Sequence, residues 1–184
     1  KMALRFKRET QESWKTMRVN AKKVNKGYGK RKGRIMFPSS HDVTPQILEE
    51  ATTVLRKILE AGNDVLVTTK PHLKVIRRFC REFESHKDLL QFRFTIGSRH
   101  SEVLKYWEPG APDFEERLAA LKHAFERGFK TSVSVEPFLD ETPAKLFTIL
   151  EPNVTESIWI GKMNYIPRKG LTEEEKKRYR HMRE

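Results

Sequence analysis

Two spacings of hydrophobic residues alternate along this chain. Short, nearly continuous apolar runs are typical of buried strands, whereas apolar residues three and four positions apart indicate amphipathic helices. The runs that predict strands are 34–37, 64–69, 91–97, 130–139 and 157–164. The segments that predict helices are 44–62, 71–85, 113–129, 142–152 and 171–184.

Residues with known cap preferences mark the ends of several of these helices. Thr44 is expected to cap the first helix at its start, and Gly62 to end it. Gly128 is expected to end the third helix in the same way. Thr172 and Glu175 have the spacing of a capping box at the start of the last helix.

Strands that alternate with helices predict an α/β fold whose parallel strands are joined by right-handed crossovers. A complete eight-stranded barrel of this kind needs about 250 residues, and the chain has 184. A partial barrel and an open doubly wound sheet both fit, and in both the ligand lies at the carboxyl ends of the strands. We expect a basic helix or linker over 1–33, the β/α body over 34–170 and a C-terminal helix over 171–184.

Polar residues gather at the predicted carboxyl ends of the strands. They include Ser39, Ser40, His41, Asp42, Thr68, Thr69, Lys70, Thr95, Ser98, Ser132, Ser134 and Glu136. Lys70, just before a proline, is either an anchor for a phosphate or carboxylate or a surface residue at a helix start, and we favour the anchor. His41 and Asp42 are adjacent and point apart on a strand, so Asp42 is expected to cap a helix.

The stretch "TSVSVEP" (131–137) alternates hydroxyl residues with valine. One face of this strand is therefore polar, and a polar face inside a barrel must be hydrogen-bonded or must bind a ligand. A row of hydroxyls satisfied by neighbouring backbone is the alternative to a ligand-lined interior, which we favour. Glu136 is either an acid/base or amine-binding group or one half of a structural salt bridge.

The charge is concentrated at one end of the chain. Lys and Arg total 37 against 25 Asp and Glu, a net charge of +12, and residues 1–33 contribute twelve basic and two acidic side chains. Such a segment can follow the phosphates of a nucleic acid, with Trp14 and Tyr28 as stacking surfaces, or it can be a solvated linker. The candidate phosphate-binding residues are Lys22, Lys23, Lys30, Arg31 and Lys32.

Composition excludes several classes of protein. The mean hydropathy is −0.70, and no apolar run approaches the length of a membrane-spanning helix, so we expect no membrane partner. The first twenty residues lack the apolar core of a signal peptide. A single cysteine, Cys80, fits a reducing cytoplasm, and its place in a helical apolar stripe predicts core packing.

Three segments of the chain are similar in sequence to one protein family. The segments "VLVTTKPHL" (65–73), "FRFTIGS" (92–98) and "VLKYWEPGAPDFEERLAALKHAFERGFKTSVSVEPFLD" (103–140) resemble radical S-adenosylmethionine proteins akin to spore photoproduct lyase. The resemblance extends over about residues 34 to 164. It implies a partial (β/α)6 barrel of the TIM type, which binds S-adenosylmethionine at a four-iron four-sulfur cluster. It also implies hydrogen abstraction by a 5'-deoxyadenosyl radical.

The chain departs from that family in one large respect. Family members bind the cluster through a C-x3-C-x2-C loop after their first strand, whereas this chain has one cysteine, and the cluster needs at least three thiolates. We count five strands where the family has six, and "KMALRF" at residue 1 resembles the helix after the cluster loop. We therefore expect the cysteines to lie upstream, in a missing N-terminal segment, and the chain as it stands to make no radical.

The resemblance also assigns candidate cofactor-binding residues. It implies that Lys70 lies near the methionyl carboxylate of the cofactor, and that Thr95, with Ser98 close behind, supplies a nearby hydroxyl. Ser39 and Ser40 fall where the second family strand meets the amino-acid part of the cofactor, and Glu136 faces the same cavity. Residues 94–112 would then be a loop across the top of the barrel, with Trp107 and Pro109 as its rim.

Three functions are consistent with these patterns. The first is the body of a radical S-adenosylmethionine enzyme, acting on a nucleic acid if the basic segment binds one. The second is a cysteine-less, non-catalytic barrel that binds nucleic acid. The third is an α/β enzyme that binds a phosphorylated metabolite. Loss of the first strand would expose the edge that begins at Arg34, so we also expect self-association through that edge.

Overall fold

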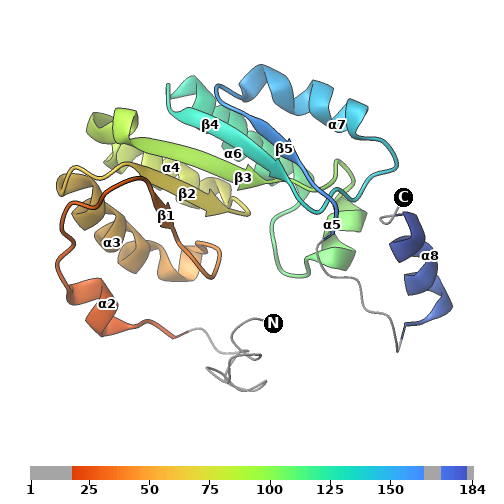
Figure 1. The fold of residues 1–184 in the computed structure, drawn as a ribbon, viewed down its shortest axis with the longest axis horizontal. Coiled ribbons are helices and arrows are strands. Elements are labelled where there is room, and N and C mark those ends of the chain that lie inside the picture. Colours follow the sequence, from red (N-terminus) through yellow and green to blue (C-terminus); the bar gives the residue numbers. More distant parts are fainter. Residues whose placement is uncertain (1–17, 164–170, 182–184) are drawn as a thin grey trace.

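The computed structural model describes residues 18–163 and 171–181, and its centre is a five-stranded parallel sheet (Figure 1). The strands are β1 (Ile35–Phe37), β2 (Val65–Thr69), β3 (Leu90–Thr95), β4 (Lys130–Val135) and β5 (Ile158–Ile160). Each strand pairs in parallel with the next, in the order β1-β2-β3-β4-β5. The predicted α/β class is confirmed. The helix predicted at residue 1 and Trp14 lie outside the described residues.

Helical segments connect the strands, as the apolar spacing predicts. The α-helices are α2 (Ala21–Asn25), α3 (Leu48–Glu60), α4 (Leu73–Glu82), α5 (Ser101–Trp107), α6 (Phe114–Glu126), α7 (Pro143–Leu150) and α8 (Glu173–His181). The 3-10 turns are η2 (Pro45–Ile47), η3 (Glu84–Leu89) and η4 (Glu151–Asn153). Of these, α5 was not predicted, because the segment from residue 94 to 112 reads as a loop in the sequence.

Most of the cap signals are confirmed. Gly62 and Gly128 have φ angles of 72° and 76°, a left-handed conformation that glycine adopts without steric cost. Thr172 and Glu175 hydrogen-bond reciprocally at the start of α8. Thr44 behaves otherwise: it precedes the 3-10 turn η2 without a side-chain cap bond, and the α-helix α3 begins only at Leu48.

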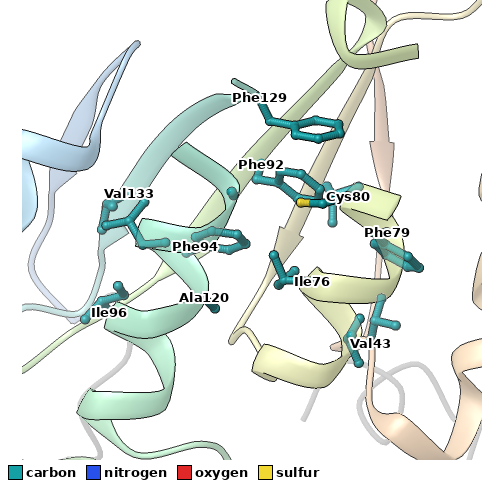
Figure 2. Close-up of a cluster of buried hydrophobic side chains, with 14 of the residues drawn as sticks. Val43, Ile76, Phe79, Cys80, Phe92, Phe94, Ile96, Ala120, Phe129 and Val133 are labelled. Carbon is teal, nitrogen blue, oxygen red and sulfur yellow. The ribbon is translucent and has the colours of Figure 1, made fainter. Parts of the chain in front are cut away.

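Alternate residues of the strands pack against the helices and form the core. Phe92, Phe94 and Val133 of the sheet are wholly buried against α4 and α6, which lie next to each other (Figure 2). The Phe92 and Phe94 ring centroids are 5.5 Å apart. Full burial of each such side chain contributes about 1.5–3 kcal/mol. We call this the covered face of the sheet.

Cys80 belongs to the same core, as predicted from its helical stripe. It is completely buried on α4 beside Phe92 (Figure 2). Burial raises the pKa of its thiol to about 12, because a thiolate is poorly solvated among apolar neighbours. The thiol therefore stays neutral at physiological pH.

The other face of the sheet carries a different set of side chains, and we call it the open face. Its residues are Met36, Leu66, Thr68, Gln91, Arg93, Thr95, Lys130, Ser132, Ser134 and Trp159. Met36 and Trp159 have 57% and 59% of their surface exposed. Among the described residues, no helix has the length and apolar character needed to cross a membrane.

Candidate functional site at the carboxyl edge of the sheet

The strand register brings three of the predicted site residues to one edge of the sheet. Thr95 is the last residue of β3 and pairs with Ser134 of β4. Thr69 pairs with Phe94, so Lys70, the next residue along, lies beside Thr95. Glu136 follows Ser134 by two positions and is exposed just beyond the end of β4. Lys70, Thr95 and Glu136 therefore each lie at the carboxyl edge of the sheet, at the ends of three successive strands.

Lys70 is held by two carboxylates. Its ammonium lies 3.3 Å from Asp42 and 3.8 Å from Glu108, and its backbone N–H donates to Asp42 Oδ1 at 2.7 Å. The expectation that Asp42 caps a helix is therefore wrong. The turn after β1 instead carries this carboxylate over the end of β2, where the amide and the ammonium of Lys70 both bind it.

Glu108 connects Lys70 to a buried arginine that the sequence pattern did not predict as a site residue. Arg117 is wholly buried on α6, and its guanidinium lies 2.7 Å from the Glu108 carboxylate. It also donates to the carbonyl oxygens of Thr95, at 3.1 Å, and Pro112, at 2.8 Å. A buried charge must be paired, so Arg117 fixes the segment from 108 to 112 against the end of β3. One signal was available in the sequence, because Arg117 interrupts the apolar stripe of α6.

A cavity of about 400 Å³ opens above Lys70. Asp42 and His72 line it from the β1 and β2 sides, and Trp107 and the segment from 108 to 112 line it from the other side. His72 lies 3.6 Å from Glu116, whose carboxylate also accepts the N–H of Leu73 at the start of α4. The long segment after β3 thus contains a short helix, α5, and the residues that follow this helix line one side of the cavity.

The three predicted serines are placed differently. Ser98 is completely buried, and its hydroxyl donates to the Asp140 carboxylate, which also accepts the N–H of Arg99 at 3.1 Å. That hydroxyl therefore joins the segments after β3 and β4. Ser39 and Ser40 lie exposed in the turn after β1. The structure does not bring Ser98 to the open face.

Polar side chains on the open face form a short hydrogen-bonded network. Gln91 Nε2 donates to Ser132 Oγ at 3.1 Å, and Ser132 Oγ donates to the carbonyl of Phe92 at 3.1 Å. On the covered face, Thr131 donates to the carbonyl of Asn153 at 2.8 Å. Backbone carbonyl groups thus accept hydrogen bonds from the hydroxyls at 131 and 132. At these two positions the structure shows hydroxyls satisfied by backbone, whereas we favoured a ligand-lined interior. Thr68 Oγ1, by contrast, is buried and has no hydrogen-bond partner within residues 18–163 and 171–181.

Glu136 lies across the carboxyl end of β5. A Cβ atom added to Gly161 would come within 2.9 Å of Glu136 Cγ, so the glycine leaves the space that this side chain occupies. The peptide bond between Glu136 and Pro137 is cis. The Glu136 side chain thus lies beside Gly161, at the same edge of the sheet as Lys70 and Thr95.

The comparisons with known proteins give one relative and no family. The chain is 31% identical over 104 residues to the uncharacterized protein ORF301 of Acidianus two-tailed virus. That stretch is 56% of this chain and 34% of the viral protein, so the chain spans about a third of the length of this relative. No protein-family model matches the chain. No solved structure matches it either.

A metal centre needs several donor side chains in one place. Within residues 18–163 and 171–181, no three His, Cys, Asp or Glu side chains are grouped to hold a metal ion. The single cysteine, Cys80, lies in the core with a neutral thiol. The described residues therefore do not fit an iron–sulfur cluster.

The basic residues from Arg18 to Arg34 lie along α3 and do not form a free arm. We call this stretch the basic segment; it carries eight Lys or Arg and no acid. Lys57 of α3 donates to the carbonyl of Val24 at 2.8 Å, and Asn63 Oδ1 accepts the N–H of Arg31 at 2.7 Å. Five candidate phosphate-binding residues are exposed on it: Lys22, Lys23, Lys30, Arg31 and Lys32.

Proposed function

We propose that this chain forms part of the barrel of a radical S-adenosylmethionine enzyme and binds S-adenosylmethionine at the carboxyl edge of its sheet. The observation that carries the proposal is the convergence of Lys70, Thr95 and Glu136 at that edge, beside a polar open face. These residues come from three successive strand ends. In parallel α/β folds, that is where ligands bind.

The strand order favours a partial barrel rather than a doubly wound sheet. A doubly wound sheet reverses its strand order at a switch point, which divides its helices between two faces. The order here is consecutive from β1 to β5. Right-handed crossovers in that order put every connecting helix on the same face, which leaves the other face to the barrel interior.

The residues at the edge fit S-adenosylmethionine. Lys70 suits the methionyl carboxylate, Glu136 suits the amino group, and Thr95 offers a hydroxyl. Asp42 and Glu108 fix the Lys70 ammonium in position before any ligand arrives.

The described residues do not supply ligands for an iron–sulfur cluster. The proposal therefore concerns the binding of S-adenosylmethionine alone. In this family, S-adenosylmethionine beside a reduced cluster supplies hydrogen-atom abstraction. On our proposal the cluster ligands come from cysteines outside this sequence, and the present chain contributes only the binding and orientation of the cofactor.

Calorimetry with S-adenosylmethionine and S-adenosylhomocysteine tests the proposal. We expect both to bind, because they share the amino-acid and adenosine groups. Lys70→Ala should weaken binding by about tenfold, as expected for the loss of one charged hydrogen bond. Lys74→Ala, an exposed lysine on α4, is the matched control and should change nothing.

Glu136→Gln keeps the shape of the side chain and should weaken binding through the amino group alone. If neither compound binds at millimolar concentration, the proposal fails.

The basic segment favours a second function, the binding of nucleic acid. Its contacts with Lys57 and Asn63 hold eight cations on one ordered path, so less ordering entropy is lost when phosphates bind. A salt titration with single-stranded and duplex DNA tests it. Replacing Lys22, Lys23 and Lys32 by Gln should flatten the slope of log K against log salt by about 0.7–0.9 for each phosphate that is no longer neutralised.

Three exposed cations of α4 provide the matched control for that titration. Lys74, Arg77 and Arg81 give the same change of net charge when replaced by Gln. Equal losses of affinity in the two triple variants would mean that only net charge matters, and the assignment to the basic segment would then be wrong.

A further inference from the structure

We propose a second binding site on the open face, where the Arg93 guanidinium binds an oxyanion, a phosphate or a carboxylate, beside the Trp159 ring. This site is distinct from the cofactor edge at Lys70. Only one part of this inference rests on the proposed function, namely that the bound anion belongs to the substrate of the same enzyme.

Arg93 lies in the middle of the sheet. It stands on β3, the central strand, between Thr68 of β2 and Ser132 of β4. The side chain is half-buried, and its Nε donates to Ser132 Oγ at 3.4 Å. In the part of the chain that the structure describes, no carboxylate forms an ion pair with it. A partly buried guanidinium is costly unless an anion compensates it.

The rest of the open face is also suited to an anion. Arg34 donates to Gln91 Oε1, and Gln91 donates in turn to Ser132, the residue that also holds Arg93. Among the described residues of the five strands, none on this face is acidic. The charged side chains on this face of the described strands, Arg93 and Lys130, are therefore both basic, and Arg93 is the one on the central strand.

Thr68 adds a second polar group at the same position. It pairs with Arg93 across the sheet, and its buried hydroxyl has no hydrogen-bond partner among the residues that the structure describes. An oxyanion bound by the guanidinium would give this hydroxyl an acceptor after a small side-chain movement. A guanidinium and a hydroxyl on neighbouring strands are common donors to phosphate and carboxylate oxygens.

Trp159 supplies a flat surface next to the guanidinium. The Arg93 Cζ atom lies 5.7 Å from the centroid of the indole ring, and the indole N–H donates to Ser157 Oγ at 3.1 Å. The ring is 59% exposed, although large aromatic side chains are usually buried. A substrate with a planar group beside its anion could stack there, and the indole gives a fluorescence signal for binding.

The position also fits a substrate that reacts next to the cofactor. Trp159 pairs with Ser134, and Ser134 pairs with Thr95, one of the proposed cofactor residues. Arg93 is two residues before Thr95 on the same strand and face, about 7 Å away. The proposed function assigns Lys70 to the methionyl carboxylate of the cofactor, so Arg93 is the cation of the neighbouring strand that remains for a second anion.

Fluorescence titration of the full chain at constant ionic strength tests the site. Pyrophosphate and succinate are the probes for a phosphate and a carboxylate. Trp159→Phe assigns the signal, because Trp14 and Trp107 also fluoresce. We expect at least one probe to bind, Arg93→Gln to weaken it at least tenfold, and Arg93→Lys to weaken it less. Lys130→Gln removes the same charge at the exposed start of β4 and should change affinity less than threefold.

The outcomes separate this site from its alternatives. Binding of pyrophosphate alone indicates a phosphate substrate, binding of succinate alone indicates a carboxylate, and both results support the site. Equal losses in Arg93→Gln and Lys130→Gln, or binding of neither probe, would overturn it. If Arg93→Gln does not fold, as judged by circular dichroism, a loss of affinity in Arg93→Lys decides instead.

Parallel calorimetry with S-adenosylmethionine distinguishes this inference from the proposed function. Arg93→Gln should keep cofactor affinity within threefold. A tenfold loss would make Arg93 a cofactor ligand and would overturn the inference. A chain that binds pyrophosphate through Arg93 but does not bind S-adenosylmethionine would retain the anion site and remove the proposed function.

Discussion

The two faces of the sheet are built from the same strands and differ in almost every property. On β3, Phe92 and Phe94 point to the covered face and are wholly buried, whereas Gln91 and Arg93 point to the open face. Because side chains alternate along a strand, one strand can stabilise the fold on one side and present polar groups on the other. Alternate residues of one strand therefore serve stability and binding, and a substitution on one face should change one of these properties without the other.

The largest expected effect comes from the covered face. Phe92→Ala should lower the free energy of unfolding by about 3–5 kcal/mol, because it removes a wholly buried ring and leaves a cavity. Met36→Ala, an exposed apolar residue on the open face, should cost less than about 1 kcal/mol. Urea denaturation measures both, and equal costs would remove the distinction between the two faces.

The ion pair behind the carboxyl edge should give the next largest effect. Arg117→Met leaves the Glu108 carboxylate, which is only 14% exposed, without its cation, and should cost about 3 kcal/mol. Adding Glu108→Leu to that variant should recover part of the loss. A double-mutant cycle should give a coupling of about 1–3 kcal/mol between the two residues. Additive effects would show that the pair does not fix the segment from 108 to 112.

Gly97 tests how tightly the edge is packed. A Cβ atom at this position would lie 2.6 Å from the carbonyl oxygen of Pro137, a backbone atom that cannot easily move. Gly97→Ala should therefore cost about 1–3 kcal/mol. Gly29→Ala is the matched control, because no atom lies within 4 Å of its added Cβ. Thermal melts of the two variants should differ clearly, and equal melting temperatures would contradict the close approach.

Cys80 gives a smaller effect that depends on pH. Burial raises the pKa of its thiol from 9.0 to about 12, so the folded state keeps the proton while the unfolded state loses it. This contribution to stability is complete below pH 9 and is lost progressively as the pH rises from about 9 to 12. Cys80→Val should remove the effect. The thiol should also react with an aromatic disulfide reagent only after unfolding, and rapid labelling of the folded chain would contradict its burial.

The smallest effect concerns the edges of the sheet. Among the described strands, β1 and β5 each pair on one side only, and Trp159 and Ile160 of β5 are exposed. Unpaired strand edges favour association with another chain. Light scattering of the purified chain should show concentration-dependent self-association that weakens in Ile160→Lys. A monodisperse monomer at high concentration would contradict this expectation.

The element types were predictable because they depend on local spacing. The five strands and the helices α3, α4, α6, α7 and α8 all appear where the apolar pattern predicts them, with bounds shifted by a few residues. The seven-residue α5 was missed, because a helix of two turns has too few apolar positions to show a period. Thr44 was misread because a 3-10 turn, η2, comes between it and α3.

The candidate site was only partly predictable. Lys70, Thr95 and Glu136 could be found because strand ends meet at one edge of a parallel sheet. Their partners could not, since Asp42 and Glu108 reach Lys70 from segments 28 and 38 residues away in the chain. The hydroxyl of Ser98, another predicted cofactor residue, donates to Asp140, which is 42 residues further along and could not be identified from the sequence.

The amino-acid sequence by itself determined the alternation of strands and helices, the burial of one strand face and the concentration of positive charge before residue 35. These follow from hydrophobic spacing and composition, which are local properties of the chain. Only the tertiary structure decided which charges meet, because pairing depends on register and on how loops fold over the sheet. That is why the buried pairing of Arg117 and the place of Arg93 at the middle of the open face became recognisable only in the folded chain.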